Sequence, residues 1–335
     1  MAQFDTIIIG AGAAGLMCAA QAPGRTLLVD HAKAAGEKIR ISGGGRCNFT
    51  NMYAGPENYI SHNPHFVKSA LARYTQWDFI DWVARSGIAY HEKTLGQLFC
   101  DHSAKDIITM LTDATQKAGV ITALRTAIVQ IDQTPAGFDV VAEGPKGRTH
   151  HSTRNLVIAT GGKPIPKMGA TDFGLKVAGQ FGQPVTQTFA GLVPYTFQGP
   201  ALEMCKSLAG VAVPTTVHTG ATFTEAALFT HRGLSGPAAL QTSSYWAEGD
   251  PVTVNVLDQT VTRDLLQSAR QSMGKRGVDA AFHGALPARL IPAVLQGLPL
   301  PARLGDLTAQ HADQIADRLS GWVLHPNGTE GYRTA

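Results

Sequence analysis

Cysteine is scarce in this chain and never occurs as a C-x-x-C pair. The four cysteines, Cys18, Cys47, Cys100 and Cys205, are widely separated within 335 residues. A disulfide framework needs dense cysteines in a small chain, and a structural zinc site needs closely spaced ligands. We therefore expect no disulfide scaffold, no metal site and a reducing, cytoplasmic location.

An excess of charge and long apolar runs are also missing. The chain has 28 basic and 25 acidic residues, a net charge of +3, and no block of Lys or Arg. Because nucleic-acid-binding proteins usually carry a basic stripe or block, we expect no nucleic-acid partner. No apolar run reaches the roughly 18 residues of a membrane span, and the first residues do not have the pattern of a signal peptide. We therefore expect no membrane partner.

The first thirty residues contain a strand, a glycine turn, a helix and a second strand. The strand at residues 4–9 leads into Gly10-Ala11-Gly12-Ala13-Ala14-Gly15, and the strand at residues 26–29 leads into Asp30. In such a turn the first glycine permits the bend, the second lets a pyrophosphate approach, and the third lets the helix pack closely. The helix start attracts phosphates, and the acid can bind ribose hydroxyls. The pattern predicts a dinucleotide site; a glycine turn in another kind of βα unit is the alternative.

A second glycine run, Gly43-Gly44-Gly45, stands directly before Arg46-Cys47-Asn48-Phe49-Thr50-Asn51. Three glycines in a row suit neither a helix interior nor a strand. We therefore expect a loop whose backbone N–H groups are exposed beside a fixed cation. Such a loop can line the phosphates or the ring edge of a dinucleotide; a flexible linker is the alternative. Cys47 could be reactive or a buried bystander.

Together the glycine turn, Asp30 and the Gly-Gly-Gly-Arg-Cys-Asn run resemble bacterial FAD-dependent oxidoreductases of the aminoacetone oxidase-like and dehydro-bile-acid-reductase-like kind. The resemblance covers essentially the whole chain and implies that FAD occupies the first site. It also implies that Ile128 holds the adenine through its backbone and that Ala159-Thr160-Gly161-Gly162 is a second FAD signature. The candidate cofactor-binding residues are Gly10, Ala11, Gly12, Ala13, Ala14, Gly15, Asp30, His31, Lys38, Gly43, Gly44, Gly45, Arg46, Cys47, Asn48, Thr50, Ile128, Ala159, Thr160, Gly161 and Gly162.

The expected fold is α/β, with a Rossmann-like FAD-binding domain of the two-dinucleotide flavoprotein type. Short strands with Gly and Pro turns follow residue 189, and helical spacing dominates residues 262–319. We expect the FAD-binding domain at residues 1–188, a β-rich barrel or sandwich at residues 189–260 and 320–335, and a helical subdomain at residues 261–319. The resemblance also implies a C-terminal return segment, which we expect this chain to lack.

We expect an FAD-dependent oxidoreductase that transfers hydride between the flavin and a small organic substrate or NAD(P)H, the latter as a transient electron donor. No catalytic side chain is assigned, because the flavin performs the hydride chemistry. The chain has no second G-x-G-x-x-G and no C-x4-C pair, which argues against a disulfide reductase. The alternatives are an NAD-linked dehydrogenase, a flavin-binding protein with a regulatory or RNA-modifying role, and a fragment that binds no cofactor.

Overall fold

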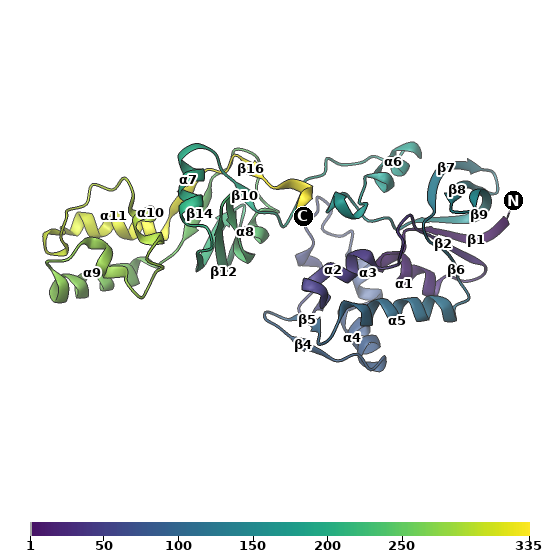
Figure 1. The fold of residues 1–335 in the computed structure, drawn as a ribbon, viewed down its shortest axis with the longest axis horizontal. Coiled ribbons are helices and arrows are strands. Elements are labelled where there is room, and N and C mark those ends of the chain that lie inside the picture. The colour runs from purple at the N-terminus through teal and green to yellow at the C-terminus, as the bar shows by residue number, and fades with distance from the viewer. Residues whose placement is uncertain (1) are drawn as a thin grey trace. The chain divides into compact units, whose positions relative to one another are not determined.

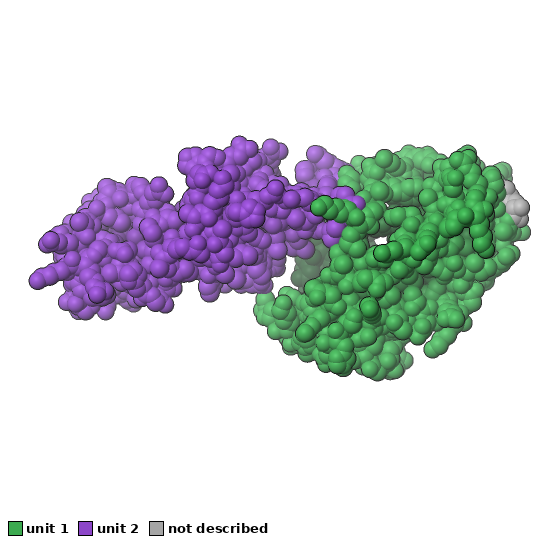
Figure 2. Space-filling view, in the orientation of Figure 1, with its two compact units in different colours: residues 1–163, 167–185 green, residues 164–166, 186–335 purple. Residues whose placement is uncertain are grey.

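The computed structural model describes residues 2–335, and the chain divides into two compact units. Unit 1 comprises residues 1–163 and 167–185, and unit 2 comprises residues 164–166 and 186–335 (Figure 2). Each unit has its own hydrophobic core. The division near residue 186 lies close to the change in composition seen in the sequence.

Unit 1 is built on a six-stranded sheet with the strand order β6-β2-β1-β9-β8-β7 (Figure 1). The first four of these strands run parallel, and β9, β8 and β7 form an antiparallel meander. Because β1 pairs with both β2 and β9, the carboxyl ends of these three strands lie at one edge of the sheet. The strands are β1 Ala2–Ile9, β2 Thr26–Val29, β6 Ile121–Ala123, β7 Ala127–Thr134, β8 Gly137–Gly144 and β9 Gly147–Ile158.

The remainder of unit 1 consists of helices and a small antiparallel sheet with the order β3-β5-β4. The helices are α1 Ala13–Gln21, α2 Glu37–Ile41, α3 Lys68–Arg73, α4 Gln76–Arg85, α5 Ala104–Lys117 and α6 Phe173–Gln180. The small sheet contains β3 Asn48–Asn51, β4 Tyr90–Glu92 and β5 Gln97–Cys100.

The central strand β1 is buried on both faces. Ile8 packs into one core cluster with Leu16 of α1 and Leu111 of α5. Ile7 and Ile9 point to the opposite face and pack into a second cluster, which includes residues of the meander and of α6. A strand covered on both faces reads as a continuous apolar run, and this explains the uninterrupted isoleucines of β1.

The glycine turn after β1 brings three backbone segments unusually close together. A Cβ atom at Gly15 would overlap the carbonyl oxygen of Gly10, and a Cβ atom at Gly10 would overlap that of Ala159. Gly10 also has a φ of 108°, which other residues rarely adopt. A Cβ atom at Gly12, by contrast, would meet no atom within 4 Å. The close packing of these segments therefore requires glycine at positions 10 and 15, whereas Gly12 faces open space.

Unit 2 is built on a seven-stranded antiparallel sheet with the order β15-β14-β11-β12-β13-β10-β16. Its strands are β10 Tyr195–Thr196, β11 Ala212–Thr219, β12 Ala221–Thr230, β13 Gly233–Ser235, β14 Val252–Asn255, β15 Trp322–Leu324 and β16 Gly328–Thr329. Its helices are α7 Gly199–Ser207, α8 Pro237–Thr242, α9 Gln259–Met273, α10 Leu290–Leu295 and α11 Ala309–Ser320.

The β-rich region does not form the expected barrel or sandwich, because its strands belong to one open sheet. β15 and β16 stand at the two ends of the strand order, so the sheet is open, and the described chain forms no second sheet in unit 2. Helices take the place of a second sheet, because Leu266 of α9 and Ile315 of α11 share one core with Val254 of β14. Among residues 2–335, no helix is both long enough and apolar enough to span a membrane.

Substituting Gly15 tests the packing of the glycine turn. We expect Gly15→Ala to lower the free energy of unfolding of the apoprotein by about 1–3 kcal/mol, because the added methyl group overlaps the Gly10 carbonyl. Gly12→Ala is the matched control and should stay within about 1 kcal/mol of the wild type, since its methyl group enters open space. Urea unfolding followed by circular dichroism measures both, and equal losses in the two variants would contradict the packing argument.

Candidate functional site

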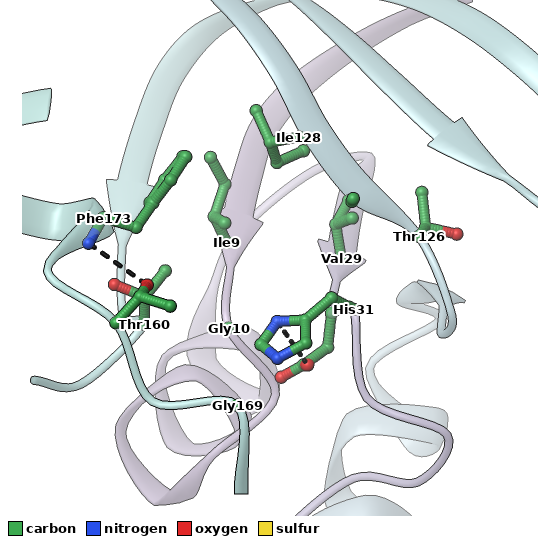
Figure 3. A pocket seen from close by; sticks show the side chains of 12 residues that line it. Ile9, Gly10, Val29, His31, Thr126, Ile128, Thr160, Gly169 and Phe173 are labelled. Carbon is green, nitrogen blue, oxygen red and sulfur yellow. Dashed lines mark hydrogen bonds and ion pairs between the residues drawn. The ribbon is translucent and has the colours of Figure 1, made fainter. Parts of the chain in front are cut away.

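A pocket of about 320 Å³ opens at the carboxyl ends of β1 and β2 in unit 1 (Figure 3). Open α/β sheets bind their ligands outside the carboxyl ends of the parallel strands. The pocket wall combines these strand ends with the start of β7, the segment after β9 and the loop before α6. Its lining residues are Ile9, Gly10, Val29, Asp30, His31, Thr126, Ala127, Ile128, Thr160, Gly169, Thr171 and Phe173.

Two backbone N–H groups hold the carboxylate of Asp30 in place. Ala11 donates to Oδ2 over 2.6 Å, and Ala32 donates to Oδ1 over 2.7 Å. The side chain is only 15% exposed, and His31 Nδ1 lies 3.6 Å from Oδ1. A carboxylate offers about four lone-pair positions, so two remain for other donors. Asp30 is thus a fixed acceptor in the pocket wall.

The start of α1 offers backbone donors to an anion. Gly12 is the N-cap residue, and no side chain caps the helix. The first N–H groups of a helix have no acceptor within it and carry a partial positive charge. Because the space beside Gly12 is open, a phosphate group can approach these donors.

Lys38 adds a cation beside the segment that follows β9. A Cβ atom built at Gly161 would lie 3.9 Å from Lys38 Nζ. The helix that carries Lys38 is attached to the glycine turn, because the Gly36 N–H donates to the Ala11 carbonyl over 2.9 Å. Two of the predicted site residues, distant in sequence, therefore meet next to the turn.

Thr160 presents a hydroxyl group that lacks a partner. Its Oγ1 is buried and has no hydrogen-bond partner within residues 2–335, and the residue lines the pocket. A buried hydroxyl without a partner costs about 1–3 kcal/mol. A ligand that bonds to Oγ1 would remove this cost.

The triple-glycine run forms a tight 3-10 turn at Ser42–Gly45 and then enters β3. Gly43 and Gly44 have left-handed φ values of 57° and 66°. A Cβ atom at Gly43 would lie 2.8 Å from the Phe99 ring, so only glycine fits there. The turn ends before Asn48, and Asn48 and Thr50 pair with β5.

The side chains that follow the triple glycine lie outside the pocket. Burial raises the pKa of the Cys47 thiol, and the hydrogen bond with Ser42 offsets only part of that shift. Reactive cysteines have a lowered pKa, so the environment of Cys47 favours a packing role. Arg46 and Asn48 are exposed, and the Asn48 amide nitrogen can donate to the Thr50 carbonyl over 3.1 Å.

Part of the predicted set of cofactor-binding residues lines the pocket. Five predicted residues line it, namely Gly10, Asp30, His31, Ile128 and Thr160. Ala11, Gly12, Ala13, Ala14 and Gly15 form the adjoining turn and helix start, and Ala159, Gly161 and Gly162 flank Thr160 in the chain. Lys38 lies beside Gly161, and the residues from Gly43 to Thr50 do not line the pocket.

The predicted set of cofactor-binding residues omits several lining residues, including Thr126, Thr171 and Phe173. Thr171 lies in a loop with two prolines and two glycines that directly follows the segment after β9, and Phe173 begins α6. In the sequence, a loop rich in proline and glycine that follows a strand end is the feature that indicates these lining residues.

These features fit the adenosine diphosphate part of FAD. Asp30 has acceptor positions for ribose hydroxyls, the start of α1 has donors for the pyrophosphate, and Thr160 has an unsatisfied hydroxyl. The described residues contain no group of three or more His, Cys, Asp or Glu side chains that could hold a metal ion.

Comparison with known proteins gives one family and several relatives. Residues 4–284 match the family described as HI0933-like protein Rossmann domain. The chain is 48% identical over 341 residues to the Ribosomal RNA dihydrouridine synthase of Escherichia coli, covering 100% of this chain and 84% of that protein. It is 42% identical over 342 residues to the protein of the same name from Haemophilus influenzae, covering 100% and 85%.

A more distant relative carries the name expected from the sequence. The chain is 24% identical over 195 residues to the 3-dehydro-bile acid delta(4,6)-reductase of Clostridium scindens, covering 56% of this chain and 46% of that protein. The expected resemblance is therefore confirmed at the level of the Rossmann family, while the more similar relatives have a different name. The predicted fold class, a Rossmann-like FAD-binding domain within a mixed α/β chain, is confirmed. The chain belongs to the HI0933-like family of Rossmann-domain proteins.

Proposed function

We propose that this chain is an FAD-dependent oxidoreductase that reduces uridine to dihydrouridine in ribosomal RNA. The observation that carries the proposal is its 48% identity, over the whole chain, to a protein named Ribosomal RNA dihydrouridine synthase. The proposal departs from the expectation of no nucleic-acid partner, which rested on the overall balance of 28 basic and 25 acidic residues.

In this proposal the pocket of unit 1 holds the adenosine end of FAD. Asp30 accepts hydrogen bonds from the ribose hydroxyls, while the N–H groups of Ala11 and Ala32 keep its oxygens in position. Thr160 gains the partner that its buried Oγ1 lacks. Ile128 lines the pocket from β7 and offers its backbone to the adenine.

The pyrophosphate then lies against the start of α1. The N–H groups of the first turn donate to its oxygens, and the missing side chain at Gly12 permits the approach. Lys38, beside Gly161, contributes a positive charge to the same region. These residues bind and orient the cofactor and take no part in the chemical step.

Bound FAD supplies the two-electron chemistry, with NAD(P)H as the proposed source of hydride. The C5=C6 double bond of uracil is conjugated with the C4 carbonyl, so hydride adds to C6 and a proton to C5. One molecule of NAD(P)H and one proton thus balance the reduction of one uridine.

A small carbonyl-conjugated alkene is the second candidate substrate. The relative from Clostridium scindens is named as a reductase of a 3-dehydro-bile acid, which is a small molecule. The same electron balance applies to that class of substrate. An NAD-linked dehydrogenase would differ from both candidates because the purified protein would hold no flavin. A non-catalytic flavin-binding protein would hold flavin but would turn over neither substrate.

Asp30 provides the test of cofactor binding. We expect Asp30→Ala to weaken FAD binding about 10- to 100-fold, because hydrogen bonds to a charged group contribute about 1.5–3 kcal/mol. Flavin absorbance per chain, measured after dialysis against known FAD concentrations, gives the affinity. Asp113→Ala, which removes an exposed carboxylate of α5, is the control. A colourless wild-type protein that takes up no added FAD would refute the flavoprotein proposal.

Uridine reduction provides the test of the substrate. We expect the purified protein with FAD and NADPH or NADH to convert uridine to dihydrouridine in ribosomal RNA transcribed in vitro, which contains no modified bases. Mass spectrometry of the digested nucleosides detects the gain of two hydrogens. The reaction should depend on the nicotinamide donor and fail in Asp30→Ala at limiting FAD. Reduction of a small enone in place of RNA would favour the second candidate.

A further inference from the structure

The basic side chains of unit 2 fall into two groups. Residues 186–335 contain ten Lys and Arg residues. Six of them are engaged within the unit: four in ion pairs with Glu or Asp, and two, Arg289 and Arg318, as donors to backbone carbonyls. The ion-paired residues are Lys206, Arg232, Arg263 and Arg333, and the interactions involve Glu203, Glu330 and Asp313.

The four remaining cations all lie at one place, the carboxyl end of α9. Arg270 is in the last turn of α9, and Lys275 and Arg276 follow its C-cap residue. Arg303 joins them from another segment, because the N–H of the next residue, Leu304, donates to the Arg276 carbonyl over 2.9 Å. We call Arg270, Lys275, Arg276 and Arg303 the α9 basic cluster.

The α9 basic cluster is exposed and unpaired. All four residues are exposed, and none of their side chains makes an ion pair, hydrogen bond or ring contact within the described part of unit 2. The nearby acids are Asp279 and Asp306, of which Asp279 lies 3.6 Å from His283 Nε2. Four cations against two acids leave a local excess of positive charge.

Helix stability explains only part of this arrangement. A cation in the last turn of a helix interacts favourably with the helix dipole, and Arg270 occupies such a position. Lys275 and Arg276 directly follow the C-cap residue and can gain from the same effect, but Arg303 comes from another segment, and the dipole of α9 does not require a cation there. Because unit 2 carries almost equal numbers of acidic and basic residues, enough acids exist to pair these cations, yet none is placed to do so.

We propose that the α9 basic cluster is the surface on which the phosphate backbone of RNA docks. This inference rests on the proposed function, which requires an RNA substrate. Guanidinium groups match phosphate oxygens with two parallel hydrogen bonds, and three of the four cations are arginines. Neutralising phosphates also releases bound counterions, so a compact cluster of unpaired cations favours a polyanion over a single small anion. The helices α9 and α11 lie side by side and share one hydrophobic core, which supports the cluster (Figure 1).

The experiment compares two triple variants with equal loss of charge. The first is Lys275→Gln/Arg276→Gln/Arg303→Gln. The control is Lys117→Gln/Lys146→Gln/Arg154→Gln, which removes three exposed cations of unit 1 that have no ion pair among residues 2–335. Filter binding to Escherichia coli ribosomal RNA transcribed in vitro gives Kd as a function of KCl concentration. Flavin content and urea unfolding check that both variants keep their fold.

We expect the cluster variant to bind RNA at least about 10-fold more weakly than the control variant. Its plot of log Kd against log salt should lose a slope of about 2, since each phosphate contact to a single strand contributes about 0.7. Equal affinities and slopes in the two variants would overturn the docking surface. Absence of RNA binding by the wild-type protein would overturn it as well.

The outcomes separate this inference from the proposed function. Dihydrouridine formation by both variants with unchanged Kd would overturn only the docking surface. RNA binding that depends on the cluster, without any dihydrouridine formation by the wild-type protein, would overturn only the proposed activity.

Discussion

The close contact between backbone segments at the glycine turn is the constraint on which the site depends. The end of β1, the start of α1 and the segment after β9 approach so closely that Gly10 and Gly15 cannot carry a side chain. This contact sets the helix start against the strand ends. It also leaves Gly12 beside open space, so that the first-turn N–H groups stay accessible to a ligand.

Around this contact, the pocket is organised largely by backbone. The N–H groups of Ala11 and Ala32 orient the Asp30 carboxylate, and the first turn of α1 supplies further donors. Donors and acceptors held by the backbone lose little freedom when a ligand binds, which favours affinity. Thr160 is the exception, because its buried hydroxyl has no partner within the described chain. That unsatisfied group indicates that the pocket is built for an occupant.

The local distribution of charged side chains says more about the partners of this chain than its net charge does. A net charge of +3 spread over 335 residues suggests no polyanionic partner. In unit 2, however, ion pairs and carbonyl contacts engage six cations and leave four at the end of α9. Association with a polyanion depends on local potential rather than on net charge, so an almost neutral unit can still present a basic surface.

The sequence by itself determined the first βαβ unit, the glycine turn and Asp30, because their determinants are local: continuous apolar strand runs, absent side chains and a fixed spacing along the chain. Only the tertiary structure decided that Lys38 meets Gly161, that Thr160 remains unpaired, and that the sheet of unit 2 is open. It likewise decided that Arg303 joins the cations at the end of α9. The physical reason is the same in each case, since these relations arise between residues far apart in sequence and exist only once the chain has packed.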